Sequence, residues 1–186
     1  MKLKFIVFTV IVILLVVCLG LFLNRSSSGP SKLDGFAHAL TDQGANFYGA
    51  FWCPHCQATK ALFGSSKQFL PYTECSTPSR DQNAVCNDKK IESYPSWTFK
   101  DGISLVSDKA PSICELKPVT GESPSCNYVR SKFYKVWIFP DYKFVIKSPT
   151  DPIKTGNVWK FPSDAMSEGE ITLQFLADQI HYTLPK

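Results

Sequence analysis

The sequence predicts one α/β domain behind an apolar N-terminal segment. Candidate strands and helices alternate from about residue 32 onwards, and one strand runs directly into a Cys-x-x-Cys motif that opens a helix. The chain has 186 residues, which suffice for one ordinary domain with appendages but hardly for two full domains. Hydrophobic residues make up 44% and aromatic residues 13%, so the chain can bury a core and is not disordered as a whole.

The charge of the chain is nearly balanced. The formal net charge is +4, and outside Lys2 and Lys4 the chain holds 18 basic and 16 acidic residues. A nucleic-acid-binding domain usually shows a marked basic excess. We therefore expect no nucleic-acid partner.

Residues 5–23 form a run without charged side chains, and Lys2 and Lys4 precede it. As a helix, these 19 residues would span roughly 28 Å, about one hydrocarbon core. The run ends without the small-x-small pattern of a signal-peptide cleavage site. We therefore expect residues 1–24 to be an uncleaved signal anchor, a single transmembrane helix that starts in the cytoplasm. After a polar linker at 25–31, the C-terminal domain would be extracytoplasmic at the cell membrane.

Five candidate elements follow the linker. Residues 32–41 carry apolar side chains at helical spacing, whereas residues 46–51 are apolar and aromatic, as in a buried strand. Pro54 suits the first position of a helix, and apolar residues at helical spacing continue to about residue 69. Residues 70–74 and 82–89 are expected to form a second strand and a short helix.

Two hairpins are expected next. Residues 96–100 and 103–106 are predicted to pair across a turn at Asp101-Gly102, a typical hairpin dipeptide. The aromatic segments 133–139 and 142–146 form the second candidate hairpin, because a Pro-Asp turn signal separates them.

The stretch from about 107 to 160 is rich in Pro, Ser, Lys and Gly and interrupts the pattern. Its few apolar side chains could hardly build a separate core. We therefore expect an insertion within one domain at 32–186 rather than a second domain. A closing helix at about 171–180 follows it, with Ser167 or Thr172 as the cap.

The motif Cys53-Pro54-His55-Cys56 carries the candidate chemistry. At a helix N-terminus, unpaired N–H groups and the helix dipole would stabilise the Cys53 thiolate, whereas Cys56 would lie one turn deeper. We therefore expect Cys53 to be the attacking sulfur and Cys56 the resolving one. The ring of His55, if partly cationic, would favour the reduced pair and make its disulfide more oxidising.

Other readings of the motif stay open at this point. A lone Cys-x-x-Cys is half a zinc site, but the chain has no second one, and His38 and His181 are not at ligand spacing. We expect no metal and no cofactor. The pair could also be a purely structural disulfide, and His55 a solvated helix residue.

Two motifs together resemble the thioredoxin family. These are the segments 51–56, Phe-Trp-Cys-Pro-His-Cys, and 94–99, Tyr-Pro-Ser-Trp-Thr-Phe. The match is most similar to the thioredoxin-like domain that is fused to, or works with, vitamin K epoxide reductase homologues. Those domains also share the residues Glu74-Cys75, Cys86, Lys90 and Ile91. The resemblance covers about 33–106 and 170–184, so the anchor and the insertion lie outside it; the tetrad also resembles that of DsbA-type oxidases.

The resemblance implies a thioredoxin-like fold with the insertion before the C-terminal helix. It implies that Pro95 is cis and packs against the cysteine pair, and that Trp52 and Tyr94 contact a substrate segment. One departure concerns Phe47, which stands where many thioredoxins carry a buried acid. The usual proton acceptor for Cys56 is then missing, which disfavours reduction by this protein more than oxidation.

The remaining cysteines outside the anchor are expected to form structural disulfides in an oxidising compartment. In the related domains the positions of Cys75 and Cys86 pair, so the resemblance implies a structural disulfide there, with a second redox relay as the alternative. A disulfide between Cys114 and Cys126 would close and stabilise the loop between them. Cys18 would be left in the membrane anchor.

Together these expectations describe a membrane-anchored, extracytoplasmic thiol–disulfide oxidoreductase, a disulfide-forming oxidase or isomerase. Its partners would be exported cysteine-containing proteins and a membrane protein similar to vitamin K epoxide reductase. One alternative is a reductive thioredoxin-like protein that delivers electrons to exported proteins. Another is a non-catalytic binding module that uses the aromatic residues Trp137, Phe139 and Tyr142 of the insertion.

Overall fold

The structure is a computed structural model, and it describes residues 11, 13–15, 31–114 and 131–186. The chain separates into two compact units, Met1–Ser31 and Lys32–Lys186. In the first unit residues 11 and 13–15 are helical, but most of the expected membrane anchor, including Cys18, lies outside the described residues. Within the described part of the chain, no helix has the length and apolar character needed to cross a membrane.

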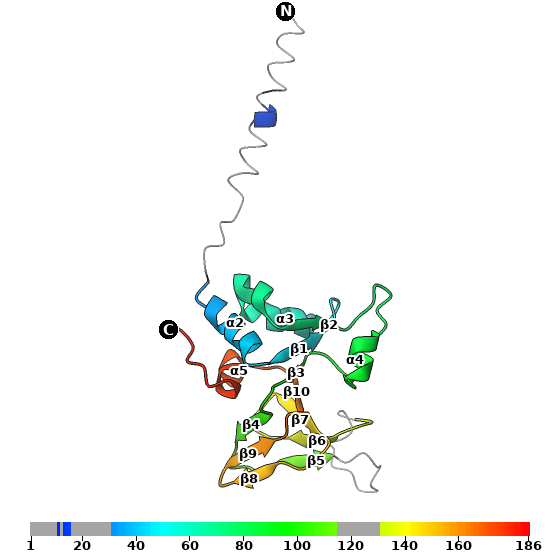
Figure 1. Ribbon diagram of the computed structural model, residues 1–186, viewed down its shortest axis with the longest axis vertical. Helices are drawn as coiled ribbons and strands as arrows, with labels where there is room; N and C mark the ends of the chain where they lie inside the picture. The colour runs from blue at the N-terminus through cyan, green and yellow to red at the C-terminus, as the bar shows by residue number, and fades with distance from the viewer. Residues whose placement is uncertain (1–10, 12, 16–30, 115–130) are drawn as a thin grey trace, which may run out of the picture. The chain divides into compact units, whose positions relative to one another are not determined.

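The second unit is built on a mixed seven-stranded sheet (Figure 1). In spatial order its strands are β2 (Tyr72–Glu74), β1 (Asn46–Gly49), β3 (Ser96–Thr98), β10 (Met166–Gly169), β7 (Phe144–Ser148), β6 (Lys135–Ile138) and β5 (Ser112–Cys114). Strand β1 runs parallel to β2 and antiparallel to β3, and β10 pairs antiparallel with both β3 and β7. A parallel β1–β2 pair connected by a helix, followed by antiparallel strands, fits a thioredoxin-like fold.

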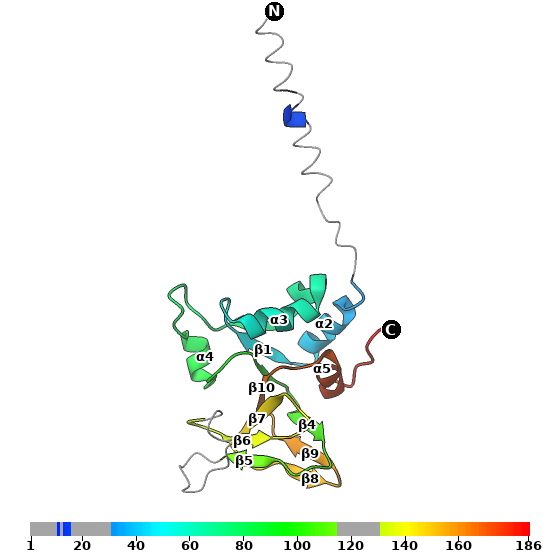
Figure 2. The ribbon, with the colours of Figure 1, turned by 180° about the vertical axis from the view of Figure 1, so that it is seen from behind.

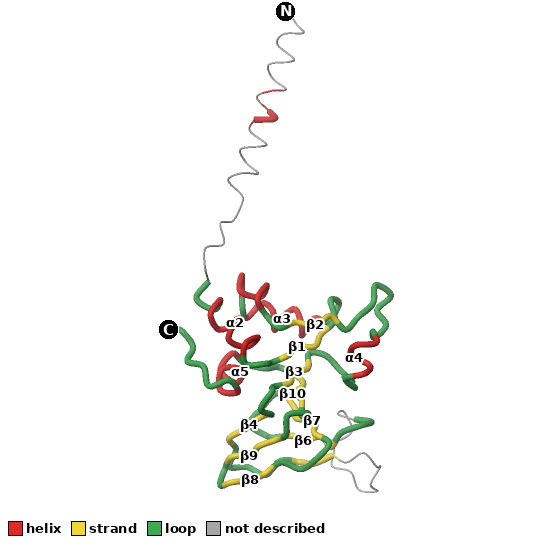
Figure 3. The backbone as a smooth tube through the Cα atoms, in the orientation of Figure 1, coloured by secondary structure: helices red, strands yellow, loops and turns green. Residues whose placement is uncertain are grey.

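The helices gather around one end of this sheet, as Figures 2 and 3 show. They are α2 (Asp34–Asp42), α3 (Pro54–Leu62), the 3₁₀ helix η1 (Gly64–Phe69), α4 (Ala84–Asp88) and α5 (Leu173–Gln179). The hydroxyl of Thr172 accepts a hydrogen bond of 3.1 Å from the N–H of Phe175 and so caps α5, whereas Ser167 lies in β10. Of the two caps expected for the closing helix, Thr172 is therefore the one in use.

The single helix expected at 54–69 is divided in two. Helix α3 ends at Leu62, and Gly64 adopts a positive φ of 55°, which a residue without a Cβ does at little cost. The chain then continues as the 3₁₀ helix η1. The apolar spacing continues to about residue 69, but Gly64 ends the α-helix before that point.

The hairpin expected between 96–100 and 103–106 is not formed, and that prediction was wrong. Strand β3 has β1 on one side and β10 on the other, so it offers no free edge to the next strand. Strand β4 (Ile103–Val106) instead pairs with β9 (Val158–Phe161), which also pairs with β8 (Ile153–Thr155) in a separate three-stranded sheet. The turn at Asp101-Gly102 therefore sends the chain from one sheet to the other.

The inserted segment joins the core of the domain. The hairpin of β6 and β7 expected from the aromatic pattern is present, and it extends the central sheet through β10. Its buried side chains Trp137, Phe144 and Ile146 belong to the same hydrophobic cluster as Trp97 of β3 and Phe175 of α5. A segment too poor in apolar residues for a core of its own thus shares one with the helices.

Gly102 lies directly against the backbone at the end of β9, and replacing it with alanine should be strongly destabilising. A Cβ there would lie 2.1 Å from the carbonyl oxygen of Phe161, and the φ of Gly102 is +80°. We expect Gly102→Ala to lower the free energy of unfolding by about 3 kcal/mol, measured by chemical denaturation, because a backbone clash adds to the left-handed conformation. The matched control is Gly156→Ala, since Gly156 has a φ of +61° but no atom within 4 Å of its Cβ position. It should cost only about 1 kcal/mol, and equal losses in the two variants would contradict the clash.

Candidate active site

The two motif cysteines meet at the start of α3. Cys53 is the N-cap of the helix, and its Sγ accepts a hydrogen bond of 3.2 Å from the N–H of Cys56. Pro54 occupies the first turn, as expected. The two Sγ atoms are 2.7 Å apart as free thiols, with Cys56 donating to Cys53. A small approach would bring them to the 2.05 Å of a disulfide bond, so the pair can switch between dithiol and disulfide.

The environments of the two sulfurs differ. Cys53 is 4% exposed and Cys56 1% exposed, while their neighbours Trp52, Pro54 and His55 are exposed. Burial, with the hydrogen bond and charge of Cys53, raises the pKa of the Cys56 thiol to about 12. A backbone hydrogen bond and the charge of Lys60 offset this rise only in part. Cys56 is therefore a thiol at neutral pH, as a resolving cysteine that waits behind the attacking one would be.

The loop before β3 faces this pair. The Tyr94–Pro95 peptide is cis, as the sequence resemblance implies, and the Cys53 thiol lies 3.7 Å from the carbonyl oxygen of Tyr94. The ring of Trp52 packs edge-on against Tyr94, and its Nε1 donates to the hydroxyl of Ser76 at 2.8 Å. The motif and the cis-proline loop, 41 residues apart in sequence, thus form one site.

Phe47 fills the place where a buried acid was expected in related proteins. It is fully buried, lies parallel to Trp97 with ring centroids 4.6 Å apart, and meets Tyr72 edge-on. This position therefore supplies no carboxylate to the cysteine pair. Any proton that Cys56 gains or loses must come from another side chain or from water.

A cluster of three polar side chains lies beside Cys56, and sequence reasoning missed it. The ammonium of Lys60 lies 3.1 Å from the ring centroid of Tyr72, whose hydroxyl donates to Oε2 of Glu74 at 2.8 Å. The other oxygen of Glu74 accepts the N–H groups of Phe51 and Ser76. The only signal in the sequence was the position of Lys60, four residues after Cys56 and thus on the same face of a helix.

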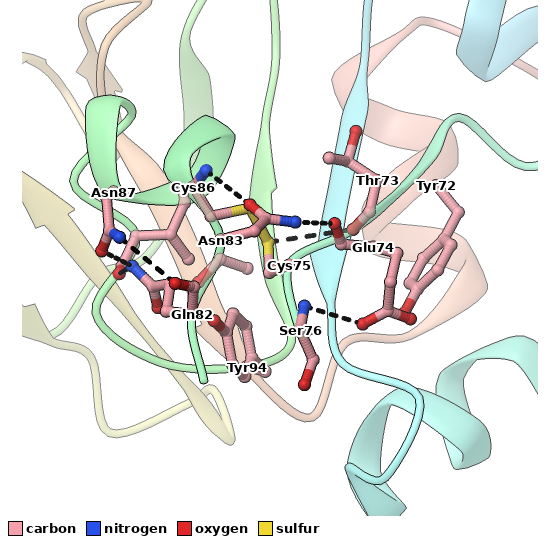
Figure 4. Close-up of a disulfide and its surroundings, with 12 residues drawn as sticks. Tyr72, Thr73, Glu74, Cys75, Ser76, Gln82, Asn83, Cys86, Asn87 and Tyr94 are labelled. Atoms are coloured by element: carbon pink, nitrogen blue, oxygen red, sulfur yellow. Dashed lines mark hydrogen bonds between the residues drawn. A yellow bond between two sulfur atoms is a disulfide. The ribbon is translucent and has the colours of Figure 1, made fainter. Parts of the chain in front are cut away.

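The disulfide between Cys75 and Cys86 borders this cluster, as Figure 4 shows. Asn83 caps α4 by accepting the N–H of Cys86 at 3.1 Å, and its amide donates to the carbonyl of Glu74 at 2.7 Å. Both cysteines are fully buried. The bridge therefore fixes α4 to the end of β2, next to the residue that binds Tyr72.

Of the two cysteines expected to form the second disulfide, the structure describes one. Cys114, at the end of β5, is disulfide-bonded and buried. Cys126, its expected partner, lies outside the described residues.

Behind the cis-proline loop lies a buried lysine from the inserted hairpin. The side chain of Lys147 in β7 is 2% exposed and pairs with Glu92 at 3.2 Å and with Glu168 of β10 at 2.8 Å. It also donates to the hydroxyl of Ser93 at 3.3 Å. Glu92 is itself fixed by the N–H of Lys132 at 2.6 Å. Burial opposes ionisation of Glu92, but hydrogen bonds from the Ser131 side chain and the Lys132 N–H, with the charge and hydrogen bond of Lys147, outweigh it and hold its pKa below the ordinary value.

A groove leads away from the cysteines. One pocket of about 440 Å³ is lined by His55 and the Tyr94–Pro95 peptide, and an adjoining pocket of about 480 Å³ lies between α3 and the inserted hairpin. The two pockets share His55, Lys143, Gly169 and Glu170, so they form one continuous surface. His55 therefore lies where the groove meets the active site.

The second pocket is lined largely by apolar side chains. They are Ala58 and Leu62 of α3, Tyr142 and Phe144 of the inserted hairpin, and Ile171 before α5. In the described part of the chain, no group of three or more His, Cys, Asp or Glu side chains is arranged to hold a metal ion. Of the sequence-predicted residues, His55, Tyr94 and Pro95 line this surface, and Cys53 and Trp52 contact Tyr94. Pro54 and Cys56 join them through the first turn of α3.

Comparison with known proteins gives one relative of direct interest. No family model matches the chain. A curated protein, the thiol-disulfide oxidoreductase LTO1 of Arabidopsis thaliana, is 35% identical over 103 residues, which are 53% of this chain and 26% of that protein. The chain thus spans about a quarter of the length of this relative. The chain is similar over half of its length to a thiol-disulfide oxidoreductase, and this similarity supports a thioredoxin-like protein of the enzyme class predicted from the sequence.

Proposed function

We propose that the protein is a membrane-anchored, extracytoplasmic thiol–disulfide oxidoreductase that forms disulfides in exported proteins. The observation that carries this proposal is the pair at the start of α3, with Cys53 as N-cap, Cys56 behind it and the cis-proline loop opposite. Few other chemistries would use two adjacent thiols at a helix N-terminus.

The reaction starts from the oxidised pair. A substrate thiolate attacks Sγ of Cys53, the Cys53–Cys56 bond breaks, and its electron pair leaves on Cys56. The mixed disulfide is then resolved by a second thiolate of the substrate, which leaves Cys53 and Cys56 reduced and the substrate oxidised. The backbone of Tyr94 would meanwhile hold the substrate segment in an extended conformation.

The environment of Cys56 supports the oxidising direction of this proposal. For this protein to release a reduced substrate, the Cys56 thiol would have to ionise and attack the mixed disulfide. Its pKa of about 12 makes that step slow, and Phe47 supplies no carboxylate to take the proton. The mixed disulfide therefore survives long enough for a second substrate thiol to resolve it, which favours oxidation of the substrate.

Reoxidation and location complete the proposal. A quinone-linked membrane partner similar to vitamin K epoxide reductase would reoxidise the pair, as the Glu74-Cys75 and Tyr94–Trp97 motifs suggest by resemblance. The apolar run at 5–23 would anchor the protein beside this partner, with the cysteines in an oxidising compartment.

The test is a stoichiometric oxidation. The full-length oxidised protein, purified in detergent, is mixed with a reduced test protein without any other oxidant, and free thiols are counted by alkylation. We expect the test protein to gain disulfides while the Cys53–Cys56 pair becomes reduced. A reduction potential near about −270 mV rather than about −120 mV would instead identify the protein as a reductant.

The apolar groove gives the proposal a substrate class, namely the extended segment that flanks the cysteine of an unfolded exported protein. The groove is continuous with the Tyr94–Pro95 peptide, so residues next to a cysteine bound at Cys53 would lie in it. We expect Leu62→Glu to raise the KM for a reduced protein substrate about tenfold while leaving reaction with a small thiol unchanged.

The matched control for this variant is Val85→Glu. Leu62 is 46% exposed and Val85, on α4, is 56% exposed and does not line the groove. Stopped-flow kinetics with both substrates would separate the effects, and an equal loss in the two variants would count against the groove as the substrate-binding surface.

A further inference from the structure

Lys60 occupies a position that the exchange reaction has not yet used. It lies one helical turn after Cys56 on α3, so the two side chains share a face of the helix. The ammonium lies over the ring of Tyr72, 3.1 Å from its centroid.

The same ring packs close to the resolving sulfur. A Cβ placed on Gly49 of β1 would lie 2.9 Å from Sγ of Cys56 and 2.9 Å from Cε2 of Tyr72. The Sγ of Cys56 and the ring of Tyr72 therefore both lie against Gly49, which has no side chain to separate them, and are within about 6 Å of each other. Glu74 accepts a hydrogen bond from the hydroxyl of this ring and so fixes its position. Lys60 and Cys56 also lie close enough for their charges to act on each other's pKa.

The charges around Lys60 are suited to proton exchange. Burial lowers the pKa of Lys60 below that of an ordinary lysine, and Lys67 of η1 acts in the same direction. Interactions with Glu74 and with the thiolate forms of Cys56 and Cys53 oppose this lowering. Lys60 thus gives up its proton more readily than a solvated lysine would.

We propose that Lys60 is the proton donor to Cys56 when the active-site disulfide opens, and that Tyr72 and Glu74 position it. The inference rests on the proposed thiol–disulfide exchange but not on the direction of that exchange. It assigns to a lysine on the catalytic helix the task that the hydrophobic ring of Phe47 cannot perform.

The step balances as follows. The attacking thiolate forms a bond to Sγ of Cys53, and the electron pair of the Cys53–Cys56 bond moves to Sγ of Cys56. Lys60 transfers one proton from its ammonium to that sulfur and becomes a neutral amine, which regains a proton from water. In the reverse step the neutral amine takes the proton of the Cys56 thiol, and the same bonds form and break in reverse order.

The test measures how fast dithiothreitol opens the disulfide of the full-length oxidised protein as a function of pH. Rates are divided by the thiolate fraction of dithiothreitol. For the wild type we expect the corrected rate to fall as pH rises through the titration of Lys60, because the ammonium is lost. Lys60→Met should be about 10²-fold slower at neutral pH and show no such fall.

Three further variants decide the role of the lysine. Lys60→Arg keeps the charge but is too weak an acid, so we expect it to remain at least about tenfold slower than wild type. Lys67→Met, the matched control, should keep the wild-type rate at neutral pH and the fall in the corrected rate, but the fall should move to higher pH because Lys67 helps to lower the pKa of Lys60. Glu74→Gln should keep the pH fall, since the donor is still present.

The inference is overturned if Lys60→Met keeps the wild-type rate, or if Lys60→Arg restores it, which would leave charge alone as the cause. It is also overturned if Lys67→Met slows the reaction as much as Lys60→Met does, or if Glu74→Gln removes the fall of the corrected rate with rising pH. Thermal melting of each variant checks that the fold is intact. Because dithiothreitol replaces the protein substrate, a protein that fails to oxidise exported proteins can still pass this test.

Discussion

Exchange of Cys53 for serine should abolish thiol–disulfide exchange, with a loss of at least about a thousandfold. Of the residues that the structure describes, only Cys53 and Cys56 are free thiols, and Cys56 is the more deeply buried of the two. A hydroxyl at position 53 could still cap α3, so the loss would reflect the missing sulfur rather than an altered fold. The measurement is the rate at which a reduced test protein gains disulfides.

Cys56→Ser should behave differently from Cys53→Ser. Its Cys53 can still attack or be attacked, but no intramolecular thiol remains to displace a bound partner. We expect it to accumulate mixed disulfides that are visible on non-reducing gels and disappear with dithiothreitol. A Cys56→Ser protein that traps nothing would contradict the assignment of Cys53 as the attacking sulfur.

The structural disulfide supplies the matched control. The double variant Cys75→Ala with Cys86→Ala removes two sulfurs that are fully buried and bonded to each other. It should lower the stability of the protein by roughly 3 kcal/mol while keeping exchange activity at a temperature where it is folded. If it loses activity as completely as Cys53→Ser, the second pair is a redox relay and not a structural bridge.

Replacing Lys147 with alanine should have the largest effect on stability, a loss of about 3–5 kcal/mol at neutral pH. The side chain is 2% exposed and lies between two carboxylates, Glu92 and Glu168, which are themselves only 14% and 17% exposed. Without the ammonium, the two partly buried carboxylates lose the charge that lies between them, and the cavity left by the side chain adds to the cost. Chemical denaturation at pH 7 measures the loss.

The loss should depend on pH in a defined direction. In the wild type the charge of Lys147 helps to hold the pKa of Glu92 below its ordinary value, so this pairing contributes stability above the unfolded pKa of about 4.3 and loses it as pH falls. The variant lacks this contribution, so we expect its deficit to be largest above about pH 4.3 and to shrink as pH falls below that value. The triple variant with Glu92→Gln and Glu168→Gln should recover part of the stability at pH 7.

An exposed ion pair from the same hairpin is the control for Lys147. The side chains of Lys143 and Glu170 are 83% and 61% exposed and lie 3.6 Å apart. Lys143→Ala should change stability by less than about 0.5 kcal/mol. A similar loss in Lys143→Ala and Lys147→Ala would show that burial of the charge is not the cause.

Local patterns predicted the elements around the cysteines correctly. The strand before Cys53, the helix that begins at Pro54, and the β6–β7 hairpin all follow from side-chain spacing within one segment. The cis Tyr94–Pro95 peptide was implied by family resemblance and is present. These features depend on residues that are close in sequence or on a motif of fixed spacing, which explains why the sequence was sufficient.

Features that depend on distant partners escaped prediction. Strand β10 has the sequence Met-Ser-Glu-Gly, with one apolar residue, and it forms a strand because β3 and β7 lie on either side of it. That placement also displaced β4 from β3. The cluster of Lys60, Tyr72 and Glu74 likewise depends on a distant pairing. The register of β1 on β2 sets Gly49 beside Glu74, which places Tyr72 against Cys56. No local sequence pattern predicts such a strand register.

Strand β10 also determines how the domain should unfold. It receives backbone hydrogen bonds from the thioredoxin-like strand β3 on one side and from the inserted strand β7 on the other. Excising residues 107–160 would leave one edge of β10 without a partner and uncover Phe161 and Phe175, which invites association between chains. We therefore expect the catalytic and inserted halves to melt in a single cooperative transition, so that neither can loosen without weakening the other.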